Sequence, residues 1–497
     1  MNAPWNNEDL RRAFDADFDA LVSFASRSKA RVGFAYLRAD GQADLGRPLD
    51  ARISARMTHV FALAQMRGIE GASHLVSHGL AALTGPLRAA NGSWYAEVVP
   101  TSETSATPVP RAILSQRAQS AMIGAAAAAI LAGHEDARTL LDDLDRDQDT
   151  RWWDPSYGAV RENIDAASGK RSPLRRLSTN LDTAQAYLAA WEATGQRVWF
   201  DRARSIVRLV GEVAARCGFA LPDFYDEEWR PLPPSCEQPP LELIRPGDTL
   251  PGLGFKAARL IGQTHAILTR MGETPCLWML DTATALYDRA LADGWTDQGI
   301  GGIIYTRDPT GVVAAPQRMH WVVCEAASAA RVLAELVEPD RADDLAVDYA
   351  RAVAWADSHA RAGAGRWIHE IAPDGTVSMH VWEGPRDARR DADGHDRVHA
   401  RVGGAPRRPH RRPHARARRS PDRPHRHGRN RPRRRSGPPQ QRRLTPELHR
   451  PRTYGVSRAP RPVYAPRPRA RRSAQHPKGR ERPADHLQLA HGRTRNT

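Results

Sequence analysis

The sequence has no long hydrophobic run. No stretch of about 18 apolar residues occurs in its 497 residues, and no apolar segment of the signal-peptide kind follows Met1. The four cysteines, Cys217, Cys236, Cys276 and Cys324, show neither CxxC spacing nor an accompanying histidine cluster. These absences argue against a membrane span, a disulfide scaffold and a zinc site. We therefore expect a soluble cytoplasmic protein with no metal, no cofactor and no membrane partner.

Acidic residues are scarce in only one part of the chain. Residues 385–497 contain 34 Lys and Arg against 8 Asp and Glu, whereas residues 1–384 contain 39 against 49. The net charge is near −10 in the first part and near +26 in the second, so the whole-chain value of +16 describes neither. Any non-specific binding of nucleic acid or another polyanion would belong to the basic part alone.

Apolar residues are almost absent from residues 385–497, as the run RVGGAPRRPHRRPHARARRSPDRPHRH from Arg401 illustrates. Such a composition cannot offset the entropy of ordering the chain, so we expect a disordered basic tail. We favour an out-of-frame translation of a GC-rich gene, because shifted GC-rich codons encode Arg, Pro, Ala, Gly and His. A functional polybasic arm and a natural linker are the alternatives.

The first 384 residues hold all 13 tryptophans and can bury a sizeable core. Apolar residues recur there at helical spacing, and Asn7 is placed to cap the first helix. Only short stretches favour strands, such as Ser93–Val99 and a hairpin within Gly299–Val313. The pattern predicts eleven helices, near 7–22, 50–64, 70–84, 114–132, 135–147, 179–194, 198–215, 253–271, 274–292, 319–336 and 341–361. Paired helices suggest a toroid of helical hairpins, which would need a twelfth helix to complete six pairs.

Five motifs follow one another in a recognisable order: ARMTHVFALA from Ala55, WWDPSYGAVRE from Trp152, DGWTD from Asp293, QRMHWVVCEA from Gln317 and GRWIHEIAPDGT from Gly365. Over residues 5–384 they resemble the mannose isomerase and sulfoquinovose isomerase branch of the N-acylglucosamine 2-epimerase superfamily. The resemblance implies an all-α (α/α)6 barrel in residues 1–384, here without a normal last helix because the pattern ends after Gly384.

The same resemblance implies an activity. Members of the family isomerise an aldose to a ketose, or epimerise a sugar at C2, by moving a proton between C1 and C2 through a cis-enediol. They need neither a metal nor an organic cofactor. The implied partner of this chain is therefore a small sugar such as mannose; the oligomeric state is left open.

The resemblance further implies roles for single residues. Arg56 would face the sugar oxygens, and Trp321 would form a platform for the sugar ring. Glu325 would accept a hydrogen bond from a sugar hydroxyl, with a structural ion pair as the alternative for this carboxylate. The substrate-binding set is completed by Asn180, Arg245 and Trp382.

Two family signatures are altered in this chain. The family's Asn-Met-His-x-x-Glu-Ala reads NLDTAQA, so Asp182 replaces a histidine, and Gly-His-x-x-Glu-Trp-x-Arg-Leu reads GLGFKAARL. Leu253 thus stands where the family has its catalytic base, and Lys256 where the family has that base's carboxylate partner. The second catalytic histidine, which would follow the segment VWEGPRDARRD, has no counterpart.

Leucine cannot accept a proton, so the family's mechanism cannot run unchanged. Asp182 could act as a base only if burial raised its pKa, and His369, on the segment WIHE, has a hydroxyl-binding role and a packing role equally open to it. We take Asp182 and His369 as the catalytic candidates and expect weak or lost turnover. The alternatives are an inactive sugar-binding relative, a damaged gene product, and a protein that binds polyanions through its tail.

Overall fold

A computed structural model describes residues 3–38, 40–234, 244–363 and 365–379. Eleven α-helices lie in this part, as the periodicity predicts, and the Asn7 side chain accepts hydrogen bonds from Asp9 N and Leu10 N at the start of the first helix. The helices are α1 (Glu8–Ala25), α2 (Ala51–Met66), α3 (Ala72–Thr84), α4 (Gln116–Leu131), α5 (Asp136–Asp147), α6 (Leu177–Thr194), α7 (Arg197–Arg216), α8 (Pro251–Arg270), α9 (Trp278–Gly294), α10 (His320–Ala334) and α11 (Pro339–Trp355).

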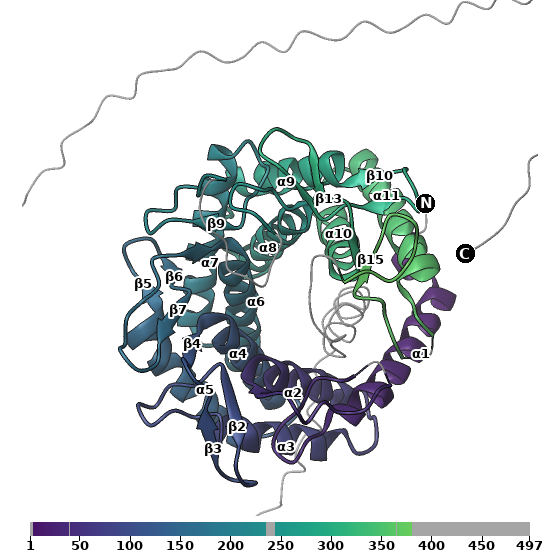
Figure 1. The fold of residues 1–497 in the computed structure, drawn as a ribbon. Helices are drawn as coiled ribbons and strands as arrows, with labels where there is room; N and C mark the ends of the chain where they lie inside the picture. The colour runs from purple at the N-terminus through teal and green to yellow at the C-terminus, as the bar shows by residue number, and fades with distance from the viewer. Residues whose placement is uncertain (1–2, 39, 235–243, 364, 380–497) are drawn as a thin grey trace, which may run out of the picture. The chain divides into compact units, whose positions relative to one another are not determined.

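The helices form two concentric rings (Figure 1). Helices α2, α4, α6, α8 and α10 make the inner ring, in which neighbours pack side by side, and α1, α3, α5, α7, α9 and α11 lie outside them. Apolar faces of both rings meet between them, which buries the aromatic and aliphatic core. The architecture is that of an (α/α)6 barrel with five inner helices among the residues that the structure describes.

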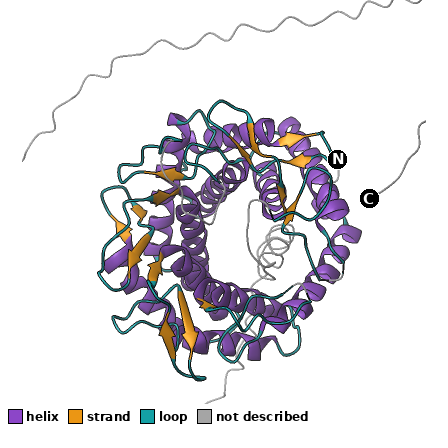
Figure 2. Ribbon diagram, viewed as in Figure 1, coloured by secondary structure: helices purple, strands orange, loops and turns teal. Residues whose placement is uncertain are grey.

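The two ends of the barrel differ in their loops. Each inner helix is joined to the following outer helix by a short turn, such as Gly195–Gln196 between α6 and α7, where Gly195 takes φ 71°. Each outer helix returns to the next inner helix through a long connection that carries short strands (Figure 2). All inner helices therefore run in the same direction, and their N-termini share the strand-bearing end.

Fifteen short strands lie in the described connections. Strands β1 (Leu49–Asp50), β2 (Glu97–Pro100) and β3 (Ala106–Pro108) form one sheet. The others pair as β4 (Ile113–Ser115) with β7 (Asn163–Asp165), β5 (Trp153–Asp154) with β6 (Ala159–Val160), β8 (Arg175–Arg176) with β9 (Phe224–Tyr225), β10 (Trp295–Thr296) with β11 (Gly302–Ile303), β12 (Thr306–Arg307) with β13 (Val313–Ala315), and β14 (Arg318–Met319) with β15 (Glu370–Ile371). Strands β1, β4, β8 and β14 each lead directly into an inner helix, which fixes where that helix begins.

The strand predictions are confirmed in part. The hairpin expected within Gly299–Val313 is present as β12 and β13, which continue to Ala315, but the preceding Gly302–Ile303 pairs with β10 instead. In the segment expected as Ser93–Val99, strand β2 begins only at Glu97, because Trp94 and Tyr95 make isolated bridges to Arg88 and Leu114. Short pairs of this kind leave little periodic signal in the sequence.

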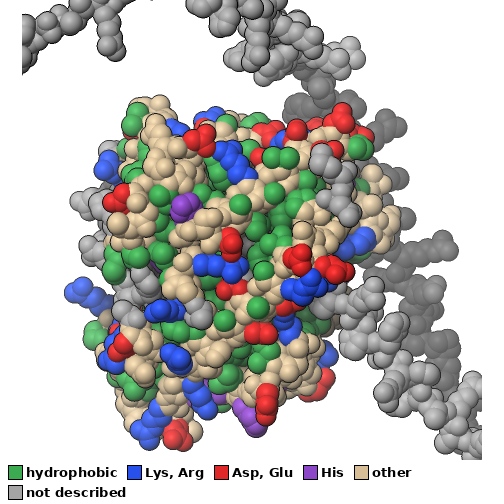
Figure 3. Space-filling model, turned by 90° about the vertical axis from the view of Figure 1, so that its right-hand side faces the viewer, with side chains coloured by type: hydrophobic (Ala, Val, Ile, Leu, Met, Phe, Trp, Pro, Cys, Tyr) green, Lys and Arg blue, Asp and Glu red, His purple; other side chains and the backbone are tan. Residues whose placement is uncertain are grey.

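A small apolar hollow lies where α1, α10 and α11 meet. It is lined by Phe14 of α1, by Val323, Cys324 and Ala327 of α10, by Ala352 and Val353 of α11, and by neighbouring residues that include Trp367. Figure 3 shows hydrophobic side chains gathered on this side of the barrel, flanked by charged ones. The described residues contain no twelfth helix, and the predicted tail, residues 385–497, lies outside them. No described helix is long and apolar enough to cross a membrane.

Candidate active site

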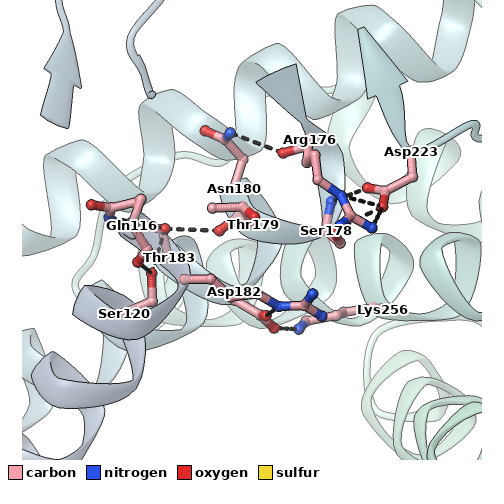
Figure 4. Close-up of polar contacts among 11 residues, drawn as sticks. Gln116, Ser120, Arg176, Ser178, Thr179, Asn180, Asp182, Thr183, Asp223 and Lys256 are labelled. Carbon is pink, nitrogen blue, oxygen red and sulfur yellow. Dashed lines mark hydrogen bonds and ion pairs between the residues drawn. The ribbon is translucent and has the colours of Figure 1, made fainter. Parts of the chain in front are cut away.

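The first polar layer of the barrel interior joins three inner helices near their N-termini. The Lys256 ammonium of α8 contacts the Asp182 carboxylate of α6 (Figure 4). Arg117 Nε of α4 lies 3.5 Å from Asp182 Oδ2. The side chains of Lys256 and Asp182 are only 5% and 12% exposed. Two neighbouring cations favour the ionised form of a carboxyl group, and this makes the group a weaker base. The surroundings of Asp182 therefore do not favour the role of a strong base.

A second layer lies about one helical turn deeper. Arg259 of α8 donates from Nε to Glu325 Oε2 at 2.7 Å and from Nη2 to Glu325 Oε1 at 3.2 Å, and both side chains are 0% exposed. The Arg259 guanidinium also donates to Gln185 of α6 and Gln263 of α8. The structural ion pair that the sequence left as an alternative for Glu325 is thus observed, while the proposed contact of Glu325 with a sugar hydroxyl stays a prediction.

Uncharged polar side chains hold α4 against α6. Gln116 Nε2 of α4 donates to Thr183 Oγ1 of α6 at 3.3 Å, and the hydroxyls of Ser120 and Thr183 lie 2.7 Å apart (Figure 4). Small and hydroxyl-bearing residues let the two helices approach closely while their buried polar groups stay hydrogen-bonded. This contact fixes the spacing between Arg117 and Asp182.

Asn180, predicted to bind sugar, is buried and largely occupied by backbone contacts. Its Oδ1 accepts from Val160 N at 2.9 Å, and its Nδ2 donates to Val160 O and Arg176 O. An amide side chain has two donor hydrogens, so only part of the acceptor capacity of Oδ1 is left for a ligand. Asn180 therefore ties β6 to the start of α6, and its sugar contact stays a prediction.

Asp223 caps α6 at the same end of the barrel. It accepts from Ser178 N at 2.7 Å and from Arg176 Nε at 2.9 Å (Figure 4). A carboxylate that accepts a free N–H in the first turn stabilises a helix N-terminus. The arrangement orients the first turn of α6, and Asp182 lies one turn further along the same helix.

Trp321, the predicted sugar platform, lies on α10 against the first turn of α8. A Cβ atom at Gly252 would overlap the Trp321 ring, so glycine is needed there for the close approach. Tyr305 also packs against the indole in an edge-to-face contact, with ring centroids 6.2 Å apart. Gly252 is four residues before Lys256 on α8, so this half-buried indole lies one helical turn from the Lys256–Asp182 pair.

His369 is brought to the N-terminus of α10 by the pairing of β14 with β15. Its Nδ1 lies 3.3 Å from Nδ1 of His320, and both side chains are buried. Two facing ring nitrogens at this separation can share only one proton, since one must donate and the other accept. His369 is thus part of a histidine pair that the sequence analysis did not predict.

The remaining predicted residues lie on α2, in or before α8, and outside the described part of the chain. Arg56 lies half-buried on α2, three residues before His59, whose Nδ1 is 3.1 Å from Gly124 O of α4. Arg245 is exposed in the loop before α8, and Leu253 is buried in the first turn of α8 at 2% exposure. Trp382 lies outside the described residues.

Glu162 is a residue that the sequence analysis quoted within WWDPSYGAVRE without assigning it a role. It follows β6, and its backbone oxygen accepts from N of Gln116, the first residue of α4, at 3.0 Å. The side chain is buried, and burial raises the pKa of Glu162 although Arg176 and Arg117 partly counter this. A carboxyl with a raised pKa at an inner-helix N-terminus is a signal that sequence alone could not give.

Metal ligation finds no support in the described residues, where no group of three or more His, Cys, Asp and Glu side chains could hold an ion. The ionisable groups instead form ion pairs and hydrogen bonds with one another. The chemistry that this interior can support is acid–base chemistry and hydrogen bonding to hydroxyl groups.

The two rings of helices and the ion-paired interior define an (α/α)6-barrel protein whose polar groups gather at the N-termini of the inner helices. Residues 33–388 match the N-acylglucosamine 2-epimerase (GlcNAc 2-epimerase) family, and the chain belongs to it.

Relatives and solved structures agree with this assignment. The chain is 34% identical over 380 residues to a D-mannose isomerase from Thermobifida fusca, covering 74% of this chain and 89% of that protein. It is 32% identical over 372 residues to a D-mannose isomerase from Pseudomonas cannabina pv. alisalensis, covering 74% and 87%. A crystal structure of D-mannose isomerase superposes with a TM-score of 0.67 at 19% identity, covering 78% of this chain and 97% of the other, which shows a shared fold. The cellobiose 2-epimerase of Spirochaeta thermophila gives 0.66 at 18% identity, covering 80% and 97%.

Proposed function

We propose that this chain binds a mannose-type hexose inside the barrel and interconverts its aldose and ketose forms, or its C2 epimers, through a cis-enediol. The observation that carries the proposal is the 32% and 34% identity to two D-mannose isomerases over three-quarters of the chain. The half-buried Trp321 supplies an aromatic face suited to a sugar ring, and Arg117 and Asp182 supply hydrogen-bonding groups near it.

The proposal includes weak turnover. Leu253 carries no proton-transfer group, and Asp182, ion-paired to Lys256, is a weaker base than the histidine that the family has at this position. A missing general base or acid commonly lowers a rate by about 10²- to 10⁴-fold. The residues that orient the sugar differ from those that transfer protons, so the affinity for the sugar is retained while the rate of turnover falls. The second candidate function is sugar binding without any turnover. It is favoured by the buried Leu253, which cannot transfer a proton.

The test is an assay of mannose–fructose exchange by the purified full chain, together with sugar binding measured by calorimetry. Weak exchange with clear binding supports the first proposal, and binding with no exchange supports the second. Turnover at the rate of an ordinary family member would refute the claim that the replaced residues disable the enzyme. Absence of binding to any hexose would refute both.

Restoring the family residues sharpens the test. Lys256→Glu alone would place a carboxylate beside Asp182, so it must be combined with Asp182→His and Leu253→His. If the triple variant exchanges mannose and fructose faster than the unmodified chain, the replaced residues account for the weak activity. The Asp348→Asn variant on the outer helix α11 is the control for an altered, half-buried carboxyl.

A further inference from the structure

We propose that Glu162 is the residue that gives and takes protons at the sugar oxygens, opposite Asp182, which exchanges the proton at carbon. This inference rests on the proposed function, because it assigns a residue to the enediol reaction. It is new in that Glu162 is neither one of the altered family histidines nor one of the residues that the sequence pointed to.

The position of Glu162 is the first argument. The residue lies between β6 and β7, and β7 pairs with β4, which leads into α4. Its backbone is held at the first residue of α4, and its side chain lies next to Thr179 in the first turn of α6. Glu162 is thus wedged between the N-termini of two inner helices, at the end of the barrel where Arg117 and Asp182 lie.

The buried Glu162 carboxyl has hydrogen-bonding capacity that the described residues do not fill. Glu162 is 5% exposed, and its Oε2 is buried without a hydrogen-bond partner among the described residues. The hydroxyl of Thr179, which is 0% exposed, hydrogen-bonds with the Glu162 carboxyl from the first turn of α6. Buried polar atoms normally find a partner, and the remaining capacity at Glu162 Oε2 suits a ligand hydroxyl.

Glu162 and Asp182 share Arg117 as a neighbour, but their surroundings differ in charge and burial. Burial raises the pKa of Glu162 and Asp223 adds to this change, whereas Arg176, a hydrogen bond with Thr179 and Arg117 oppose it. Asp182 instead contacts two cations, Lys256 and Arg117, and neighbouring cations favour the ionised form of a carboxyl group. Paired carboxyls whose surroundings favour opposite protonation states are the arrangement that separates an acid role from a base role.

The proposed step balances. The Asp182 carboxylate removes the C2 proton of the open-chain aldose while the Glu162 carboxyl delivers its proton to O1, which gives the neutral cis-enediol. Glu162, now a carboxylate, accepts the proton from the O2 hydroxyl while Asp182 returns its proton to C1. The C1=O double bond has become C2=O, and both residues end in their starting states.

The experiment compares Glu162→Gln, Glu162→Asp and the control Asp348→Asn in the full chain. Measurements are kcat and KM for mannose, the pH profile of kcat, the incorporation of deuterium at C2 in D2O by NMR, and sugar binding by calorimetry. We expect Glu162→Gln to lower kcat about 10²- to 10⁴-fold with KM and binding nearly unchanged. The fall of kcat at high pH, which reports deprotonation of the acid, should disappear in Glu162→Gln and persist in Glu162→Asp.

Each other result overturns the inference in a distinguishable way. Wild-type kcat and pH profile in Glu162→Gln would remove Glu162 from the reaction and leave the proposed function intact. If Glu162→Gln and Glu162→Asp both fold but lose sugar binding as well as kcat, Glu162 is a structural or binding residue. If the unmodified chain binds sugar without exchanging the C2 proton, neither carboxyl transfers protons. If it binds no sugar, the proposed function fails as well. Thermal melting of each variant verifies that the protein is folded.

Discussion

Replacing Glu325 with glutamine removes one charge from an ion pair whose two side chains are both fully buried. The Arg259 guanidinium then stays in the barrel interior without its carboxylate, although Gln185 and Gln263 still accept two of its hydrogen bonds. Breaking a buried pair from one side costs about 3–5 kcal/mol, and the two remaining acceptors place this case near the lower end.

That cost converts into a melting shift. An unfolding entropy of about 2.1 cal/mol/K per residue gives about 0.8 kcal/mol/K over roughly 370 described residues, so ~3 kcal/mol lowers the melting temperature by about 4 °C. Differential scanning calorimetry of the full chain measures the shift. The matched control is Glu212→Gln in the exposed pair of Arg208 and Glu212 on α7, where we expect less than about 1 kcal/mol.

A double variant separates lost attraction from a stranded charge. Arg259→Met with Glu325→Leu removes both charges and should be less destabilised than Glu325→Gln alone. If Glu325→Gln costs no more than the surface control, the reasoning from burial is wrong. An unchanged melting temperature combined with a raised KM would instead support the role of Glu325 as an acceptor for a sugar hydroxyl.

Four further outcomes are expected. Burial raises the pKa of Glu162 above 4.5, so the native state holds this proton more tightly than the unfolded state, and the contribution of Glu162 to stability falls as the pH rises from 4.5 through the raised value. Glu162→Gln should therefore melt at a higher temperature than the unmodified chain at pH 8 but not at pH 4. Equal melting curves at both pH values would refute this expectation. Gly252→Ala should displace the Trp321 ring, lower the free energy of unfolding by about 1–3 kcal/mol and weaken sugar binding, as measured by calorimetry and tryptophan fluorescence. The control is Gly46→Ala, because a Cβ added there would make only an ordinary contact at 3.5 Å. Lys256→Glu should destabilise the barrel by about 3 kcal/mol or more in urea unfolding, and combining it with Asp182→His should restore most of that stability. If combining Lys256→Glu with Asp348→Asn restored stability equally well, the direct contact between Lys256 and Asp182 would not explain the loss. DNA binding by a fragment of residues 385–497 should match that of the full chain and weaken steeply with salt, and salt-independent binding would exclude an electrostatic tail.

The local pattern of the sequence was sufficient to predict the helices. Apolar side chains at helical spacing gave all eleven described helices, and Asn7 marked the start of the first. Periodicity succeeds because each helix buries one stripe against the other ring, whatever its neighbours are. Five ordered motifs were enough to indicate the family, which the match over residues 33–388 confirms.

Partners across the barrel could not be predicted in the same way. Asp182 and Lys256 are 74 residues apart in sequence, and Glu325 and Arg259 are 66 apart. The sequence showed Lys256 and Asp182 only as two departures from a family pattern, while the structure joins them as one ion pair. Which residues meet depends on how inner helices are rotated and staggered in the ring, and this follows from packing of whole helices.

The sequence by itself thus determined the succession of helices, the separation of an acidic body from a basic tail, and the loss of the family's histidines, because each of these is written in local composition or identity. Only the tertiary structure decided that Glu325 pairs with Arg259, that His369 faces His320, and that Glu162 is buried between α4 and α6. The protonation state and available partners of a side chain depend on the groups that surround it in space, and those groups come from helices far apart along the chain.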